Sequence, residues 1–428
     1  MNDHSRPLLA IGKGSTEPGE LTGSTMSRDS RSVCIIVENQ PVPFDRRVWQ
    51  QARALTDAGY RVSVICPKDP ICASSHEFIE GIQIYRHSIW SGRGRLGYTV
   101  EYAMALVVQF YLALKVYVRS GFTILQACNP PDTVFLIALF FKLFGVRFVF
   151  DHHDLCPELF EVKFARRGLL YRIVCLAERL TFRTADLSIA TNESYRGVAV
   201  ARGGMDAQRV VVVQTCADLA EVDASLPAPA LKRGKQLMVV YVGVMEIQDG
   251  VHLLVESIDY LVKQRRRDDT LFVLIGSGNE LPHLQSMTAR LGLDGTVEFT
   301  GRIPHQQVDS YLSTADICVA PDPSNPLNDN CTMIKNLEYM AHGRPVVLYD
   351  LKEGRRTLGD AALYARPNDP IDFALQIEKL LDSPSLRDEL GRAGRERAEQ
   401  DLNWEVQKGK LVAAFAQLSA NPAQLTAD

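Results

Sequence analysis

The sequence predicts an α/β protein built from two Rossmann-like domains that face a common cleft. Both halves of the 428-residue chain alternate short apolar runs with helix-length amphipathic runs. Strands that alternate with helices form parallel sheets covered by helices. Residues 223–235 are rich in proline, alanine and charge without periodicity, which is typical of a linker. The chain is also too long for one ordinary core, so each half is expected to form a domain of its own.

The composition is that of an ordinary folded protein. Hydrophobic residues make up 46% of the chain, charged residues 23%, and the formal net charge is -4. This balance argues against nucleic acid as the main partner. The nine cysteines are scattered without a CxxC pair, as expected in the reducing cytoplasm. Residues 1–30 are polar, lack the apolar core of a signal peptide, and are expected to form a disordered tail.

The first domain is predicted from residue 31 to residue 226. Its first helix, residues 46–59, places Val48, Ala52 and Leu55 on one stripe and ends at Gly59. Short apolar runs before and after this helix predict the strands of the first sheet. These runs are residues 32–39, 61–67, 81–87, 123–128, 146–154, 187–192 and 210–214.

The second domain is predicted from residue 235 to residue 400. Its strands are expected at residues 238–243, 271–276, 296–301, 316–321 and 345–350. Helices are expected at residues 249–264, 279–292, 305–315, 369–381 and 385–400, and around Glu338. In the remaining segment, residues 401–428, a last helix near residues 404–418 is expected to cross back onto the first domain.

Two features of the second domain predict a phosphate site, because ligands of such sheets bind beyond the carboxyl ends of the strands. Several strands there end in small residues that let backbone amides approach a phosphate, although many α/β turns look alike. These residues are Gly243, Gly276, Ser277, Gly278 and Gly301. The second feature is a helix that carries Lys335 and Glu338 three residues apart, on one face. The N-terminus of this helix carries the positive end of the helix dipole, which favours a bound anion such as phosphate.

A resemblance to a known family runs from about residue 33 to about residue 418. In the second half it is carried by YVGVMEIQDGVHLLVESI, LIGSGNELPHL, VEFTGRIPHQQVDSYLSTADICVAPDP and NLEYMAHGRPVV. These segments resemble the nucleotide-binding domain of family-4 glycosyltransferases, which have the GT-B fold. In the first half, PFDRRVWQQARALTDAGYRVSVICP and FDHHDLCPELF resemble bacterial members that build exopolysaccharide, capsule or O-antigen. The order of the motifs is specific, whereas no single motif is.

The resemblance implies transfer of a sugar from a nucleotide-sugar donor with retention at the anomeric carbon. UDP is the favoured nucleotide, no metal or other cofactor is expected, and the acceptor is a saccharide or a polyprenyl-linked saccharide. Glu338 aligns with the second glutamate of the family's E-x7-E element, which binds the donor ribose. A carboxylate suits this role because it accepts two hydrogen bonds from a diol. The expected donor-binding residues are Gly243, Gly276, Ser277, Gly278, Arg302, Lys335 and Glu338.

Three departures from the family pattern weaken this reading. Asn330 stands at the first glutamate of E-x7-E, with Asp329 beside it as a possible stand-in. The family's phosphate-binding arginine and lysine are missing from GVMEIQDG, which leaves Lys335 to face the diphosphate. The glycine pair of the first loop is replaced by PVPFDRR. Its charged residues are expected to bind phosphate or acceptor, or else to form an ion pair at a helix start; they are Asp45, Arg46 and Arg47.

The segment DHHDLCPE is the candidate for the acceptor side of the site. Within it, His152, His153 and Asp154 lie together at the end of a predicted strand. Histidine titrates near neutral pH and can position or deprotonate a hydroxyl. By resemblance, His153 and Asp154 align with the family's HD pair and, with Asn330, are the expected catalytic residues, while His152 is expected near the acceptor or phosphate. The alternative is that the histidines bind buried carbonyls; zinc is disfavoured because a third ligand is missing.

An apolar segment leaves two readings open for the region from Tyr102 to Arg119. Residues 102–114 are uncharged but too short to span a bilayer, and Lys115 and Arg119 follow them. One reading is a buried element of the first domain. The other is peripheral contact with the inner face of the plasma membrane, where the basic residues meet anionic headgroups.

Two rival functions remain beside glycosyl transfer. One is a catalytically silent GT-B scaffold in a polysaccharide assembly complex, which Asn330 and the missing basic pair favour. The other is a GT-B nucleotide-sugar epimerase, which needs no acceptor. A dinucleotide oxidoreductase is disfavoured, because the first strand–helix turn, ENQPVPFD, contains no GxGxxG.

Overall fold

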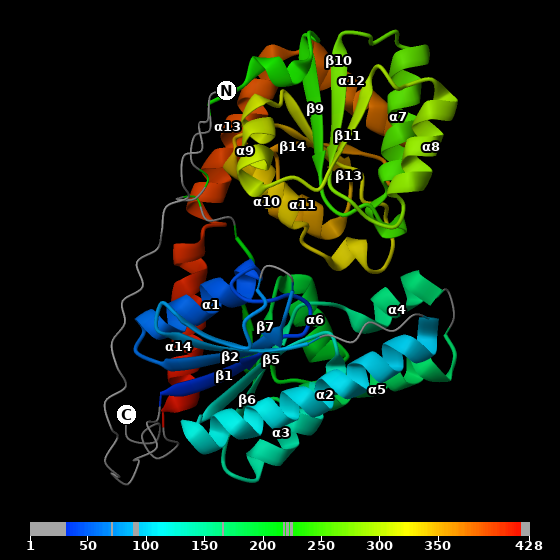
Figure 1. Ribbon diagram of the computed structural model, residues 1–428. Helices are drawn as coiled ribbons and strands as arrows, with labels where there is room; N and C mark the ends of the chain where they lie inside the picture. The colour runs from blue at the N-terminus through cyan, green and yellow to red at the C-terminus, as the bar shows by residue number, and fades with distance from the viewer. Residues whose placement is uncertain are drawn as a thin grey trace, which may run out of the picture.

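The computed structural model describes residues 31–69, 72–88, 94–164, 167–216, 219, 222 and 226–420. The expected tail, residues 1–30, lies outside them, as do residues 421–428. Figure 1 shows two α/β domains, one above the other, with the C-terminal helices along one side. The predicted fold class, two Rossmann-like parallel sheets, is confirmed.

The first sheet has eight strands in the order β3-β4-β2-β1-β5-β6-β7-β8. Neighbouring strands are parallel except for β3 and β4. Val33 of β1 pairs with Val62 on one side and with Ile124 on the other, so the strand order reverses beside the central strand. The strands are β1 (Ser32–Ile36), β2 (Arg61–Pro67), β3 (His76–Ile79), β4 (Ile82–His87), β5 (Ile124–Cys128), β6 (Arg147–His152), β7 (Leu187–Ala190) and β8 (Val210–Val212).

Helices cover both faces of the first sheet, and each face has its own apolar cluster. Helix α1 forms as its apolar stripe predicts, with Val48, Ala52 and Leu55 fully buried, and Asp45 caps it by accepting from the Val48 amide. The helices are α1 (Arg46–Asp57), α2 (Gly94–Arg119), α3 (Phe135–Lys142), α4 (Cys156–Phe164), α5 (Leu169–Thr184) and α6 (Glu193–Ala201), with short 3-10 turns at Asp132–Val134 and Ala207–Arg209.

The second sheet is fully parallel, in the order β11-β10-β9-β12-β13-β14. Its strands are β9 (Leu237–Val242), β10 (Thr270–Ile275), β11 (Val297–Gly301), β12 (Ile317–Ala320), β13 (Val346–Tyr349) and β14 (Ala362–Ala365). Its helices are α7 (Val251–Lys263), α8 (Leu281–Leu291), α9 (His305–Thr314), α10 (Ile334–Ala341), α11 (Lys352–Leu358), α12 (Pro370–Asp382) and α13 (Pro384–Gln400). Three 3-10 turns lie at Pro229–Lys232, Ile247–Asp249 and Asn328–Asn330.

The last helix, α14 (Trp404–Ser419), returns to the first domain, as the sequence predicts. Leu411, Ala414 and Phe415 are buried in the apolar cluster that α1 also fills. Tyr60 and Ser419 hydroxyls lie 3.2 Å apart at its far end. The first domain is therefore completed by residues from the end of the chain.

A buried carboxylate joins α1 to the sheet of the first domain. Asp151 lies at the end of β6 with no exposed surface, and Arg47 approaches its Oδ1 to 2.8 Å. Gln51 donates to Asp151 Oδ2 at 2.7 Å, and Arg47 also donates to the Val213 carbonyl at 2.8 Å. Burial alone would raise the pKa of Asp151, but Arg47 and His153 hold it well below its usual range.

The buried pair generates a prediction for stability. Arg47→Ala should lower the free energy of unfolding of the first domain by about 3–5 kcal/mol, because it leaves the Asp151 charge buried without its partner. Urea denaturation followed by circular dichroism measures the change.

Arg53→Ala, on the same helix, is the matched control. Arg53 lies 2.9 Å from Glu80, and both side chains are about half exposed. Loss of this surface pair should cost less than about 1 kcal/mol. An equal effect of the two substitutions would show that the Asp151 network does not stabilise the domain.

Candidate active site

Loops at the carboxyl ends of the two sheets meet where the domains contact each other. Asn192, two residues after β7, donates to the Asn330 carbonyl at 2.9 Å and to the Thr332 hydroxyl at 3.1 Å. Nearby, the Ser194 hydroxyl donates to Glu353 Oε1 at 2.5 Å. The interface between the domains therefore lies at the sheet edges where ligands of this architecture bind.

The glycines of the second domain let two loops pack directly against each other. A Cβ atom on Gly276 would lie 1.8 Å from the Gly243 carbonyl oxygen, and one on Gly278 would lie 2.3 Å from the Met245 oxygen. The Met245 amide donates to the Ser277 carbonyl at 3.0 Å. No side chain fits at Gly276 or Gly278, so these glycines fix the shape of the predicted phosphate loops.

Lys335 lies beside these glycine loops, near the start of α10. Its Cε is 3.5 Å from the position of a Cβ on Gly243, and its Nζ is 5.1 Å from the centre of the Tyr241 ring. The ammonium also forms a largely buried ion pair with Asp322 at 2.6 Å. Burial and Asp322 raise the pKa of nearby Asp249 to about 6, against the opposing effect of Lys335. A diphosphate bound here would compete with Asp322 for the lysine.

Glu338 lies one turn later on α10 and faces the first domain. Its Oε1 is 4.0 Å from Arg46 Nη1, and 22% of its side chain is exposed. Burial raises the pKa of Glu338, while Arg46 acts in the opposite direction. A second contact crosses the interface at Arg302, whose guanidinium lies 5.3 Å from the Phe44 ring centre. The loop before α1 and the first residue of that helix thus bring Phe44 and Arg46 to two predicted donor-binding residues.

The Asn330 side chain supports its own loop. Its Nδ2 donates to the Pro326 carbonyl at 2.8 Å, while its backbone carbonyl is held by Asn192. Asp329, the possible stand-in for the missing glutamate, accepts from the Ser324 hydroxyl at 3.0 Å. Both polar residues therefore have partners within or beside their loop.

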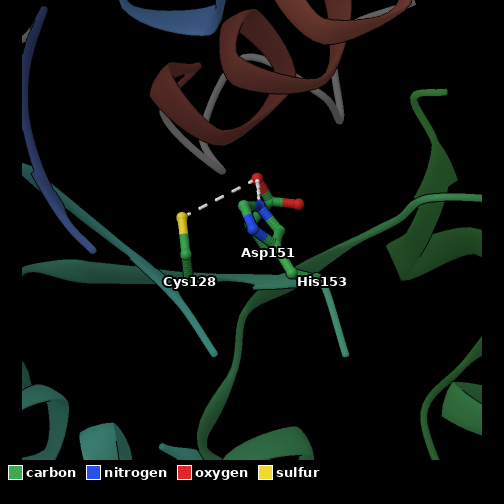
Figure 2. A group of neighbouring side chains, drawn as sticks. All are labelled: Cys128, Asp151 and His153. Carbon is green, nitrogen blue, oxygen red and sulfur yellow. Dashed lines mark hydrogen bonds and ion pairs between the residues drawn. The ribbon is translucent and has the colours of Figure 1, made fainter. Parts of the chain in front are cut away.

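His153 lies in a compact group with Cys128 and Asp151, which Figure 2 shows from one side. His153 Nε2 is 2.8 Å from Asp151 Oδ2, and Cys128 Sγ is 3.9 Å from the same oxygen. Burial lowers the pKa of His153, but Asp151 and Cys128 outweigh it and raise this pKa well above its ordinary value. The Asp151 carboxylate therefore favours the protonated ring, against the nearby Arg47 guanidinium. In the protonated form the ring can donate a hydrogen bond or supply positive charge, but it is a poor base.

The same three groups are close enough to hold a metal ion, but their surroundings favour a charge network instead. Arg47 Nη2 lies 2.8 Å from Asp151 Oδ1, and Arg47 Nε lies 3.1 Å from His153 Nε2. The guanidinium thus already pairs with the Asp151 carboxylate and donates to the His153 nitrogen, which are two of the three groups that would have to bind a metal.

Three residues predicted on the acceptor or phosphate side are placed elsewhere. His152 has no exposed surface and packs among the rings of Phe150, Phe182 and Tyr195. Burial, Arg202 and His153 lower the pKa of His152 to about 3, so it is neutral. Arg47 is buried on Asp151, and Asp45 caps α1, so neither offers a free charge; only Arg46 of this trio reaches the domain interface. The sequence motifs place these residues next to one another, but they do not indicate which side chains point into the core and which point to the domain interface.

Sequence reasoning missed the residue that shapes the HD loop, Asn129. Its Oδ1 accepts from the backbone amides of His153 at 2.7 Å and Asp154 at 3.2 Å, and its Nδ2 donates to the Asp154 carbonyl at 2.7 Å. Asp322, the partner of Lys335, was missed as well. Asn129 directly follows β5, and Asp322 lies two residues after β12, just as His153 follows β6. A polar residue at the end of a strand, the pattern that pointed to His153, was therefore also present at Asn129 and Asp322.

Two family descriptions match the chain. The family described as "Glycosyl transferases group 1" matches residues 236–383, in the second domain. The family described as "Glycosyl transferase 4-like domain" matches residues 45–216, in the first domain. Together the two matches cover most of the chain and include the loops at the carboxyl ends of both sheets.

Similar proteins of known activity are glycosyltransferases. An alpha-D-kanosaminyltransferase of Streptomyces kanamyceticus is 29% identical over 36% of this chain and 38% of that enzyme. A glycogen synthase of Mycobacterium tuberculosis is 24% identical over 84% of this chain and 87% of that enzyme. The first match spans well under half of its relative, whereas the second spans nearly all of it.

Solved structures share the arrangement of the two domains. Sucrose-phosphate synthase from Thermosynechococcus elongatus has a TM-score of 0.74 at 20% identity, covering 91% of this chain and 99% of that one. The Anabaena protein HepE, in complex with UDP-glucose, has a TM-score of 0.65 at 15% identity, covering 90% of this chain and 99% of that one. These likenesses show the GT-B fold. With the two family matches, they establish that the chain belongs to the group 1 glycosyltransferases, family 4, a family of retaining enzymes that use nucleotide-sugar donors.

Proposed function

We propose that this glycosyltransferase takes a sugar from a UDP-linked donor and passes it to a saccharide or lipid-linked saccharide in the synthesis of a cell-surface polysaccharide. The observation that carries the proposal is the placement of Lys335 and Glu338 on one helix at the domain interface. Lys335 lies beside the glycine loops, and Glu338 faces Arg46 of the first domain. The shared fold of HepE, whose structure holds UDP-glucose, supports a UDP donor.

In this proposal the donor lies along α10. The Glu338 carboxylate accepts hydrogen bonds from the ribose hydroxyls. The diphosphate lies on the backbone of residues 243–245 and 276–278 and draws Lys335 away from Asp322. Arg302, on its strand-end loop, lies beside the base. Positive charge then comes from protein side chains, and no metal is needed to neutralise the diphosphate.

The transfer step needs stabilisation of the leaving group more than it needs a base. The acceptor hydroxyl oxygen forms the new bond to the anomeric carbon, the bond to the diphosphate oxygen breaks, and the hydroxyl proton passes to the departing phosphate. Protonated His153 supplies positive charge on the first-domain side, and Lys335 supplies it on the other. Asp154 and Asn330 position sugar hydroxyls. No covalent intermediate is required, so the acceptor attacks from the same face as the leaving group.

The first prediction from this proposed function concerns the binding of the nucleotide by Glu338. Glu338→Ala should weaken UDP binding about 10- to 100-fold, the range expected when hydrogen bonds to a charged group are lost. Calorimetric titration of UDP and GDP into both proteins measures the effect and identifies the base. Glu256→Ala, at an exposed position of α7, is the matched control and should bind as the wild type does. Folded wild-type protein that binds neither nucleotide would favour the scaffold.

The second prediction separates the phosphate from the nucleoside. Lys335→Met should weaken UDP binding about tenfold or more while leaving uridine binding unchanged, because the lysine contacts only the diphosphate. Lys352→Met, at an exposed position of α11, is the control. Equal losses for UDP and uridine would mean that the substitution acts through the fold, and thermal denaturation of the variant tests that directly.

The third prediction is a pH dependence that arises from Glu338. Because burial raises its pKa, the carboxylate is lost at a higher pH than for an exposed glutamate, so nucleoside affinity should fall as the pH is lowered through that raised value. Uridine is the appropriate ligand, since it carries no phosphate that titrates. Glu338→Gln should show weak binding without this pH dependence. A wild-type profile that stays flat to pH 4 would contradict the assignment.

A further inference from the structure

The outer surface of the first domain carries an unusual number of exposed apolar side chains on α2, α3 and α5. On α2 they include Met104, Val107, Tyr111 and Val118, spaced by three, four and seven residues along one stripe. The opposite side of the helix packs into the domain through Ala113 and Val116. A solvent-facing stripe is normally polar, yet the exposed fractions here reach 67% at Val107 and 76% at Val118.

The neighbouring helix α5 repeats this arrangement. Leu169, Ile173 and Leu176 form an exposed apolar stripe at helical spacing. On α3 and just after it, Leu139 and Leu143 are exposed as well, Leu143 to 80%. Helices α2 and α3 are therefore only partly buried; for α2 the sequence had left burial and membrane contact open.

The three helices form one continuous surface, defined here as the apolar face. Phe110 of α2 packs edge-on against Phe140 of α3, with ring centres 5.0 Å apart. Lys142, at the end of α3, donates to the Thr184 carbonyl at the end of α5 at 2.9 Å. In Figure 1 the three helices lie together along the lower side of the first domain.

The charges on this face have one sign. Among the side chains that the structure describes on α2, α3 and α5, the acidic ones are Glu101, which is half-buried, and Glu178, which is buried and lies 2.7 Å from Arg202. The exposed charged residues of these helices are Lys115, Arg119, Arg172, Arg179 and Arg183. A chain with a net charge of -4 thus presents a locally positive surface around its exposed apolar residues.

We propose that the apolar face lies on an anionic lipid bilayer, with its apolar side chains at the headgroup–acyl boundary. Helices that lie flat on a membrane combine apolar residues with flanking lysine and arginine in this way. A second copy of the chain is a poorer partner, because pairing two such faces would bring like charges together. The attachment is peripheral: within the described ranges, no helix is apolar over a length sufficient to cross a bilayer.

The position of the face relative to the active site suggests a use for it. Helix α2 follows the end of β4, and α5 runs back to the start of β7, so both begin on the side of the sheet where the strands end. The exposed Leu169 and Leu170 are at that end of α5. A bilayer on this face would reach toward the domain interface, where a lipid-linked acceptor must be presented. The membrane proposal rests on the exposed apolar and basic side chains of this face, and it does not depend on which sugar donor the enzyme uses.

Vesicle flotation tests the proposal with the full chain. Wild-type protein should float with vesicles of phosphatidylcholine and phosphatidylglycerol, and less with phosphatidylcholine alone or at high salt. Val107→Ser, Tyr111→Ser and Val118→Ser in one variant should reduce binding at least tenfold. Arg172→Gln should reduce it roughly fivefold, since one basic residue near an anionic surface contributes about that much.

Phe78→Ser is the matched control, because Phe78 is 63% exposed on the edge strand β3, outside the apolar face. It should float as the wild type does. Circular dichroism and UDP titration verify that the triple variant remains folded with an intact donor site, so loss of lipid binding is separable from loss of function. Wild-type protein that fails to float with anionic vesicles would overturn the proposal. So would a lipid-free dimer that the triple variant converts to a monomer, since the face would then bind a second copy.

Discussion

The Asp151 carboxylate, withdrawn from water at the end of β6, is the charge around which the first domain's part of the site is arranged. An isolated buried carboxylate is very unfavourable, so groups from other elements must approach it. Arg47 and Gln51 approach from α1 and Gln126 from β5. This requirement fixes the orientation of α1. It also favours the charged form of His153, so one carboxylate influences both the placement of a helix and the charge of a candidate catalytic residue.

The orientation of α1 in turn determines which of its side chains contact the second domain. Arg46 precedes Arg47 in the chain, so anchoring one arginine in the core points the other toward Glu338. Besides the contact of Arg302 with the Phe44 ring, the two domains are joined by hydrogen bonds of Asn192 with Asn330 and of Ser194 with Glu353. Polar interfaces between domains exchange readily with water, so relative movement of the two domains is the default expectation. Donor entry needs such opening, and closure would exclude the water that hydrolyses the donor.

The sequence was most informative for elements that a local pattern of residues is sufficient to identify. Buried strands show as continuous apolar runs, and most strands of both sheets were predictable from them. β3 was not, because HEFI lies at a sheet edge and alternates between exposed and half-buried residues. β14 is a four-residue strand at the opposite edge of the other sheet, too short for a clear pattern. Edge strands depend on their neighbours more than on their own composition.

The site could be located from the sequence, but the partners of its charged residues could not. A lysine beside glycine loops is visible in the chain, whereas its pairing with Asp322 depends on how β12 and α10 pack. His152 and His153 are adjacent, yet consecutive residues at a strand end point to opposite sides. Burial in the core lowers the pKa of His152, whereas Asp151 raises the pKa of His153. Composition and motif position hold no information about such differences, because desolvation and neighbouring charges set them.

The return of α14 to the first domain constrains the order in which the protein is completed during synthesis. Leu411, Ala414 and Phe415 fill the same apolar cluster as Val48 and Leu55 of α1. The ribosome releases those residues only after it has released every element of the second domain. The second domain, whose sheet and helices run without interruption from β9 to α13, has all its elements earlier. Nascent chains therefore reach a finished second domain while the first still lacks part of its core, which reverses the usual N-terminal-first order.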